Sequence, residues 1–107
     1  MGKSQNQRLH SASNHVITVW IENGTIKWYL GLVEKSIGDN FLVSYLTKTD
    51  IDGKFWKFPE KEDLWETTKG QILQKNVTVE YFGTVTFECK IVSVELIKAM
   101  NEKIKKF

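Results

Sequence analysis

The sequence feature that most constrains the fold is a β-hairpin signal near the N-terminal end. Residues 16–22 alternate and are rich in β-branched side chains, and they end at Asn23-Gly24. This dipeptide accepts the positive φ angles that a two-residue hairpin turn requires. Residues 25–34 follow as a second run of aromatic and aliphatic side chains. We therefore predict an antiparallel hairpin over residues 16–34.

Short strands and tight turns continue beyond the hairpin. The predicted elements are a third strand (40–46), a turn (Asp52-Gly53), a short fourth strand (54–58) and a turn or fifth strand at Leu64-Trp65. Pro59 ends the fourth strand because its nitrogen cannot donate to a ladder. Strands of this length and spacing are typical of a small, strongly bent antiparallel barrel. We predict such a barrel over residues 15–66.

The C-terminal part of the chain, residues 67–107, has a different pattern. Short runs in it predict further strands, and the hydrophobic period changes at Ser93. Apolar residues then recur at helical spacing, at Ile97, Met100, Ile104 and Phe107. Ser93 is placed to cap this amphipathic helix. We predict one mainly β domain in which this extension packs on the barrel, preceded by a disordered tail or cloning remnant over residues 1–14.

The second strand of the hairpin is apolar on both faces, whereas a small barrel has a single interior. Alternate residues of a strand share a face. One face carries Tyr29, Gly31 and Val33, and the other carries Trp28, Leu30 and Leu32. We predict that the C-terminal helix covers the Trp28 face and that the protein is a monomer. The alternative is a dimer interface on that face.

Charge and cysteine content narrow the function classes. Fifteen basic residues nearly balance thirteen acidic ones, for a net charge of +2, so the whole chain lacks the strong basic charge typical of nucleic-acid binding. The single cysteine, Cys89, excludes an intramolecular disulfide and fits a reducing compartment. No apolar run has the length of a membrane span or a signal peptide. We expect an intracellular protein that does not bind membranes.

The inventory of reactive side chains predicts no enzyme, no metal site and no cofactor. His10 and His15 lie in or beside the predicted tail, and Cys89 has no identifiable histidine partner. Cys89 lies in an alternating run and is expected to be a small buried residue. Aromatic residues are abundant instead, at 12% of the chain, and we expect several of them at the surface.

Three segments carry a resemblance to a known family. They are VWIENGTIKWYLGLV (19–33), FLVSY (41–45) and DGKF (52–55). They resemble the strands and turns of a Tudor domain, most closely the Tudor domains of Polycomb-like chromatin proteins. The resemblance covers about half of the chain and implies an SH3-like, Tudor-like barrel over residues 15–66. Residues 68–107 have no counterpart in that domain.

The resemblance also implies an aromatic cage that binds a methylated lysine. Matched position by position, the cage residues are Trp20, Tyr29, Tyr45 and Phe55. The connection over residues 47–53 is longer than in the family, so Trp56 is the alternative to Phe55, and otherwise Trp56 and Trp65 are expected to pack beside Pro59. A rim carboxylate is expected from Glu22, Asp50 or Asp52. Aromatic faces attract a methylated ammonium, which stays charged but is poorly hydrated.

We therefore expect a non-catalytic, chromatin-associated binding module in the nucleus, whose partner is a methylated, histone-tail-like peptide. Two alternatives stay open. One is a small barrel that binds DNA or RNA, and the other is a barrel that binds an unmodified peptide as a structural subunit. We expect nucleic acid to be at most a secondary partner. Four basic residues near the C-terminus favour nucleic-acid binding: Lys98, Lys103, Lys105 and Lys106. The same lysines also suit the end of a helix.

Overall fold

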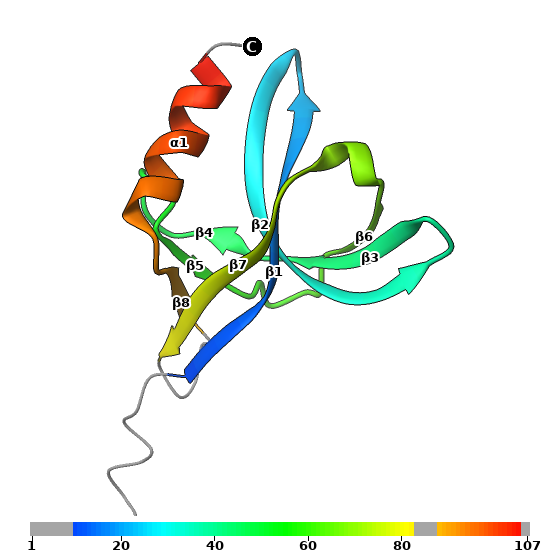
Figure 1. Cartoon of the computed structure of the whole chain (residues 1–107), viewed down its shortest axis with the longest axis horizontal. Helices are drawn as coiled ribbons and strands as arrows, with labels where there is room; N and C mark the ends of the chain where they lie inside the picture. Colours follow the sequence, from blue (N-terminus) through cyan, green and yellow to red (C-terminus); the bar gives the residue numbers. More distant parts are fainter. Residues whose placement is uncertain (1–9, 83–87, 106–107) are drawn as a thin grey trace, which may run out of the picture.

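The computed structural model describes residues 10–82 and 88–105 of the 107. This part of the chain forms one antiparallel sheet of eight strands and a C-terminal helix (Figure 1). The strands are β1 (His10–Glu22), β2 (Thr25–Ile37), β3 (Asn40–Tyr45), β4 (Thr47–Lys48), β5 (Phe55–Lys57), β6 (Leu64–Thr67), β7 (Ile72–Phe82) and β8 (Glu88–Ile91). The helices are the short 3-10 helix η2 (Lys69–Gln71) and α1 (Val94–Lys105). The predicted fold class, mainly β with one C-terminal amphipathic helix, is confirmed.

The predicted hairpin is also confirmed. β1 and β2 pair in antiparallel register up to Glu22 and Thr25, the two residues that flank the turn. Asn23 and Gly24 form the turn with φ angles of 52° and 78°. The sequence predicted a hairpin turn at this dipeptide because Asn and Gly accept such positive φ angles.

β1 begins earlier than predicted, at His10, inside the segment expected to be a tail. Its first residues pair with β7, from His10 opposite Tyr81 to Ala12 opposite Val79. The polar composition of residues 10–14 offers little to bury, but backbone hydrogen bonds to a neighbouring strand do not depend on side-chain polarity. Residues 1–9 lie outside the described residues.

The strands of the C-terminal part lie in the middle of the sheet. The strand order is β4-β5-β8-β7-β1-β2-β3-β6, so β7 and β8 separate β1 from β5. β7 pairs with β1, and β8 pairs with both β7 and β5. β7 and β8 are therefore part of the sheet itself, and without them β1 and β5 are not connected through the sheet.

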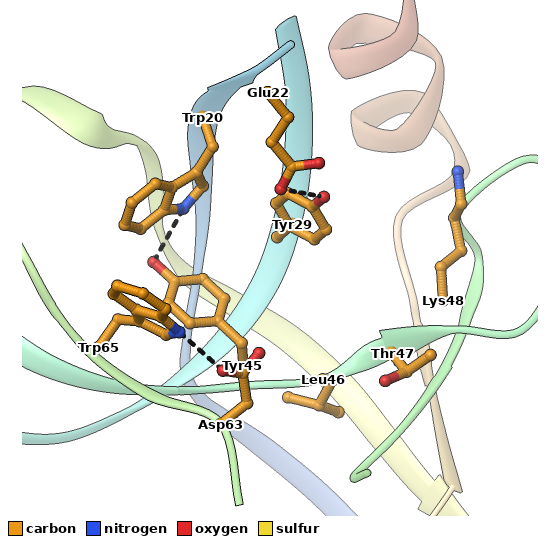
Figure 2. A pocket seen from close by; sticks show the side chains of 9 residues that line it. All are labelled: Trp20, Glu22, Tyr29, Tyr45, Leu46, Thr47, Lys48, Asp63 and Trp65. Carbon is orange, nitrogen blue, oxygen red and sulfur yellow. Dashed lines mark hydrogen bonds between the residues drawn. The ribbon is translucent and has the colours of Figure 1, made fainter. Parts of the chain in front are cut away.

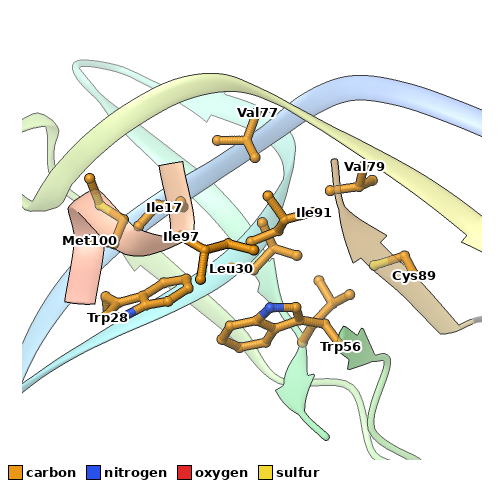
Figure 3. Packing of buried hydrophobic residues seen from close by; sticks show 11 residues of the cluster. Ile17, Trp28, Leu30, Trp56, Val77, Val79, Cys89, Ile91, Ile97 and Met100 are labelled. Atoms are coloured by element: carbon orange, nitrogen blue, oxygen red, sulfur yellow. The ribbon is translucent and has the colours of Figure 1, made fainter. Parts of the chain in front are cut away.

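The sheet curls so that its β4 end returns to β2. The N–H of Leu46, between β3 and β4, donates to the carbonyl of Leu30 at 3.1 Å, and β4 then pairs with β5. The buried residues on this side, which we call the main core, are Ile17, Trp28, Leu30, Leu46, Trp56, Val77, Val79, Cys89, Ile91, Ile97 and Met100 (Figure 3). The α1 residues Ile97 and Met100 cover this core, as their spacing predicted. No helix in the described part of the chain is long and apolar enough to cross a membrane.

Both apolar faces of β2 pack within the chain. Trp28 and Leu30 face the main core, and Nε1 of Trp28 donates to Oδ1 of Asn101 in α1 at 2.9 Å. The opposite face joins a second cluster, built from buried Val16, Val43 and Tyr45 with Trp20, Tyr29, Val33, Phe41 and Ile72 around them. Leu32, predicted to lie under the helix, is half-buried and outside both clusters. The reason is that α1 runs toward the turn between β1 and β2 (Figure 1). Its contact with this face is therefore at Trp28, which lies nearer that turn than Leu32 does.

The connection between β4 and β5 folds back onto Trp28. The carboxylate of Asp50 accepts the N–H groups of Gly53, Lys54 and Phe55 at 3.2, 3.3 and 2.9 Å. Gly53 has a φ angle of +89°, and a Cβ there would lie 2.5 Å from Cζ2 of Trp28. The connection thus closes the main core at a position that only glycine fits.

Gly53→Ala is expected to destabilise the fold by about 2 kcal/mol, because the added methyl group meets the Trp28 ring while the backbone stays left-handed. Gly24→Ala is the matched control, since its φ angle is +78° but no atom lies within 4 Å of the added group. It should lose only the backbone part, about 1 kcal/mol. Chemical denaturation of both variants measures the difference. Equal losses would contradict the close approach of Gly53 to Trp28.

Candidate functional site

The face of the hairpin that looks away from the main core carries the residues of the candidate site. Alternation along β1 and β2 places Trp20 and Tyr29 on this face. Tyr45, the last residue of β3, pairs with Gly31 of β2. A Cβ at Gly31 would lie 2.3 Å from Cγ1 of Val43 and 3.3 Å from the Tyr45 ring. Because Gly31 has no side chain, Val43 and the Tyr45 ring can pack directly against the backbone of β2.

Four aromatic residues surround one open cleft of about 400 Å³, which we call the aromatic cleft (Figure 2). Its lining consists of Trp20, Glu22, Tyr29, Tyr45, Leu46, Thr47, Lys48, Asp63 and Trp65. The ring centroid of Trp20 lies 5.8 Å from that of Tyr45 and 6.0 Å from that of Trp65. Those of Tyr29 and Tyr45 lie 6.3 Å apart. All three pairs meet edge to face, at 82°, 65° and 80°, so the ring faces point in different directions around the cleft.

Tyr45 forms the floor of the aromatic cleft and is itself buried. Its hydroxyl oxygen lies 3.0 Å from Oγ1 of Thr18 and 2.9 Å from Oγ1 of Thr67, both of which are completely buried. Nε1 of Trp20 donates to Oγ1 of Thr18 at 2.9 Å and to the Tyr45 hydroxyl at 3.3 Å. Buried polar groups are stable when they are paired in this way. This hydroxyl network therefore holds the rings of Trp20 and Tyr45 in place.

Trp65 forms an exposed wall of the cleft, although the sequence predicted that it packs beside Pro59. Its side chain is 55% exposed, and its Nε1 donates to Oδ1 of Asp63 at 2.7 Å. Alternation along β6 is the signal that locates it. Thr67 is hydrogen-bonded to the Tyr45 hydroxyl beneath the cleft, so Trp65, two residues earlier in the strand, lies on the same face.

Two carboxylates, Glu22 and Asp63, stand at the rim of the cleft. The hydroxyl of Tyr29 donates to Oε2 of Glu22 at 2.8 Å, and Nζ of Lys27 lies 3.6 Å from Oε1. Burial, the hydrogen bond to Glu22 and the charges of Glu22 and Asp63 raise the pKa of Tyr29 to about 12. The Tyr29 hydroxyl therefore stays protonated at neutral pH and holds the Glu22 carboxylate at the rim.

Phe55, predicted as the fourth cage residue, lies outside the aromatic cleft. It belongs to β5, where it pairs with Lys90 of β8, and its ring centroid lies 6.0 Å from that of Phe82. Trp56, the alternative, is 1% exposed in the main core. The pairing of β5 with β8, which the sequence did not reveal, holds this strand away from the cleft. Trp65 is the fourth ring instead.

Of the three predicted rim carboxylates, only Glu22 lines the cleft. Asp50 binds the backbone amides of the β4–β5 connection, as described above. Asp52 lies in the same connection, where its carbonyl accepts Nδ2 of Asn101 at 3.0 Å. This connection belongs to the Trp28 side of the hairpin, the side opposite the cleft. Asp63, which the sequence did not single out, is the second acidic residue of the lining.

Cys89 and His15 are buried, and neither belongs to the lining of the cleft. Burial raises the pKa of the Cys89 thiol to about 12, so the thiol is protonated at neutral pH, as expected for a small buried residue. His15 is hydrogen-bonded to the hydroxyl of Tyr81, and burial lowers its pKa to about 4. Within residues 10–82 and 88–105, no three His, Cys, Asp or Glu side chains are grouped to hold a metal ion.

Comparisons with protein-family models, with curated proteins and with solved structures found no match for this chain. The resemblance to Tudor domains accordingly rests on the segments quoted above and stays a prediction.

Proposed function

We propose that this chain is a non-catalytic binding module that holds the methylated ammonium group of a lysine side chain in the aromatic cleft. One observation carries the proposal: four aromatic rings, set edge to face, surround an open cleft with two carboxylates at its rim. Aromatic faces carry negative charge density and attract cations. Methylation keeps the charge of the ammonium and removes hydrogen-bond donors, so water competes less well for it.

The expected affinity is modest. Each aromatic face contributes about 0.5–2 kcal/mol to the binding of a cation, and the rim carboxylates add an attraction that solvent weakens. Ordering the ligand opposes binding. The rings of Trp20 and Tyr45 are already held by the hydroxyl network, which reduces the entropy lost by the protein. We expect a dissociation constant for a peptide on the order of 1–100 μM.

The partner is a peptide of the histone-tail type, and the protein acts on chromatin in the nucleus. Support for this part of the proposal comes from the resemblance to the Tudor domains of Polycomb-like proteins, in the segments that supply Trp20, Tyr29 and Tyr45. The shape of the site agrees with a peptide ligand. Because the cleft is open, it can admit a side chain that stays attached to an extended backbone.

Trp65→Ala is expected to weaken the binding of a methylated lysine by about two- to thirtyfold and to leave the thermal midpoint within about 2 °C of the wild-type value. The reason is that the ring lines the cleft but is 55% exposed. An array of methylated histone-tail peptides identifies a ligand, and titration of that ligand into each variant gives the affinity. Trp65→Phe keeps an aromatic face and should retain most of the binding. Ile51→Ala, at a position 92% exposed and outside the cleft lining, is the control.

Trp20→Ala and Tyr45→Ala are less suitable for testing ligand binding, because a loss of affinity could come from a loss of folding. Both residues belong to the buried hydroxyl network, so their loss leaves buried partners unpaired and destabilises the fold. A folded wild-type protein that binds no methylated peptide would overturn the proposed function. So would a Trp65→Ala variant whose affinity equals that of the wild type.

A further inference from the structure

We infer that the aromatic cleft selects a monomethylated or dimethylated lysine over a trimethylated one, and that Asp63 makes this selection. The inference rests on the proposed function and adds the methylation state to it. A monomethylated or dimethylated ammonium keeps at least one N–H group, whereas a trimethylated ammonium has none. Selection between them therefore needs an acceptor in the cleft that still has hydrogen-bonding capacity.

Asp63 meets this requirement. Its Oδ1 accepts Nε1 of Trp65 at 2.7 Å, which holds the carboxylate beside the aromatic rings (Figure 2). Its Oδ2 has no hydrogen-bond partner among the residues that the structure describes. An ionised carboxylate offers about four acceptor positions. Asp63 is thus fixed in place by one bond and free to accept another from a ligand.

Glu22, the other carboxylate of the lining, is differently placed. Both of its oxygens are engaged, Oε2 by the Tyr29 hydroxyl at 2.8 Å and Oε1 by Nζ of Lys27 at 3.6 Å. The positive charge of Lys27 beside Glu22 offsets part of its negative charge. We therefore assign Glu22 a general attraction for the cation and assign the choice of methylation state to Asp63. Lys48 also lines the cleft, but it lies across the cleft from Trp65 and Asp63 (Figure 2).

The selection follows from what each ligand offers to Asp63. An N–H of the bound ammonium makes a charge-assisted hydrogen bond to the carboxylate, which is stronger than a bond between neutral groups. A methyl group in its place removes water from the carboxylate without replacing the hydrogen bond. We expect the dimethylated form to bind about five- to tenfold more tightly than the trimethylated form. The unmethylated form, which is the best hydrated, should bind most weakly.

The test uses the whole chain and four probes, Nα-acetyl-lysine amides that carry zero, one, two or three ε-methyl groups. Their affinities are measured by NMR from the shifts of the tryptophan indole N–H resonances. Asp63→Asn is expected to bring the ratio of dimethyl to trimethyl affinity close to one. Glu22→Gln is the matched control, which should lower both affinities and keep their ratio. Using the ratio cancels the general loss of negative charge that the two variants share.

The outcomes separate the two proposals. If the wild-type protein binds the trimethylated probe at least as tightly as the dimethylated one, or if Asp63→Asn keeps the preference, the selection is wrong and the proposed function stands. If no methylated probe and no methylated peptide binds, the proposed function itself fails. The ranking of the four probes by the wild-type protein tests the selection even where a variant does not fold.

Discussion

A chain that ends after Glu66 is expected to show no cooperative unfolding transition. Without β7, β8 and α1, β1 loses its second neighbour in the sheet and β5 pairs only with β4. Six of the eleven buried residues of the main core are lost as well, namely Val77, Val79, Cys89, Ile91, Ile97 and Met100. Burying one aliphatic side chain contributes about 1.5–3 kcal/mol. The combined loss is comparable with the whole stability of a small domain, about 5–15 kcal/mol.

Circular dichroism during heating, and amide NMR spectra, compare the shortened chain with the full chain under the same conditions. The full chain should melt in one sigmoidal step and give well-dispersed amide resonances. The shortened chain should change gradually with temperature and give collapsed spectra. A sharp transition in the shortened chain would mean that residues 15–66 fold as a complete barrel by themselves.

Acidification from pH 7 to pH 4 is expected to remove roughly 3 kcal/mol of stability through His15 alone. The His15 side chain is 1% exposed, its Nε2 is paired with the hydroxyl of Tyr81, and its Nδ1 has no partner among the described residues. Burial lowers the pKa of His15 from 6.5 to about 4 in the folded protein. Between pH 6.5 and pH 4 the His15 side chain is protonated in the unfolded chain but not in the folded chain. Stability therefore falls as the pH falls through this window, and His15 has no effect on it well above pH 6.5.

His15→Gln removes the titrating group while keeping a polar side chain at the position. The free energy of unfolding of both proteins, measured by chemical denaturation at pH 7, 5.5 and 4, gives the two pH profiles. The variant should be less stable at pH 7 but should lose less stability on acidification than the wild type does. Parallel profiles would show that His15 is not held neutral by the fold.

Local signals account for the parts of the fold that the sequence predicts correctly. The Asn23-Gly24 turn sets the register of the hairpin, and alternation then separates Trp28 from Tyr29 onto opposite faces. The three-residue step from Ile97 to Met100 identifies the face of α1 that packs on the core. Each of these features depends on residues that are close together in the chain.

Pairing between distant strands has no comparable signal. β7 lies beside β1, and β8 lies beside β5, although long stretches of chain separate the partners. An alternating strand can pair with many others, because its pattern specifies a buried face and not a neighbour. For this reason we predicted residues 67–107 to be an extension of the barrel. The resemblance to Tudor domains places Phe55 in the cage, whereas the pairing of β5 with β8 holds it elsewhere.

The difference between local signals and long-range strand pairing also explains which residues of the candidate site were predicted. Trp20, Tyr29 and Tyr45 are predicted from the resemblance to Tudor domains, and the structure brings them together because the neighbouring strands β1, β2 and β3 carry them. Trp65 comes from β6, an edge strand whose pairing with β3 is made after the chain has passed through β4 and β5. Asp63 precedes that strand in a charged segment, and nothing in the local pattern distinguishes it from its acidic neighbours.

The central strand β1 serves two interiors at once. Ile17 points into the main core, whereas Val16 belongs to the second cluster and Thr18 is hydrogen-bonded to Tyr45 beneath the aromatic cleft. A slip of one residue in this strand would exchange the two sets, placing a hydroxyl among aliphatic side chains and an isoleucine in the hydroxyl network. Neither side can therefore change its register without the other. The half that carries the aromatic cleft and the half that α1 covers are therefore expected to unfold together, and a fragment that contains only the cleft is not expected to fold.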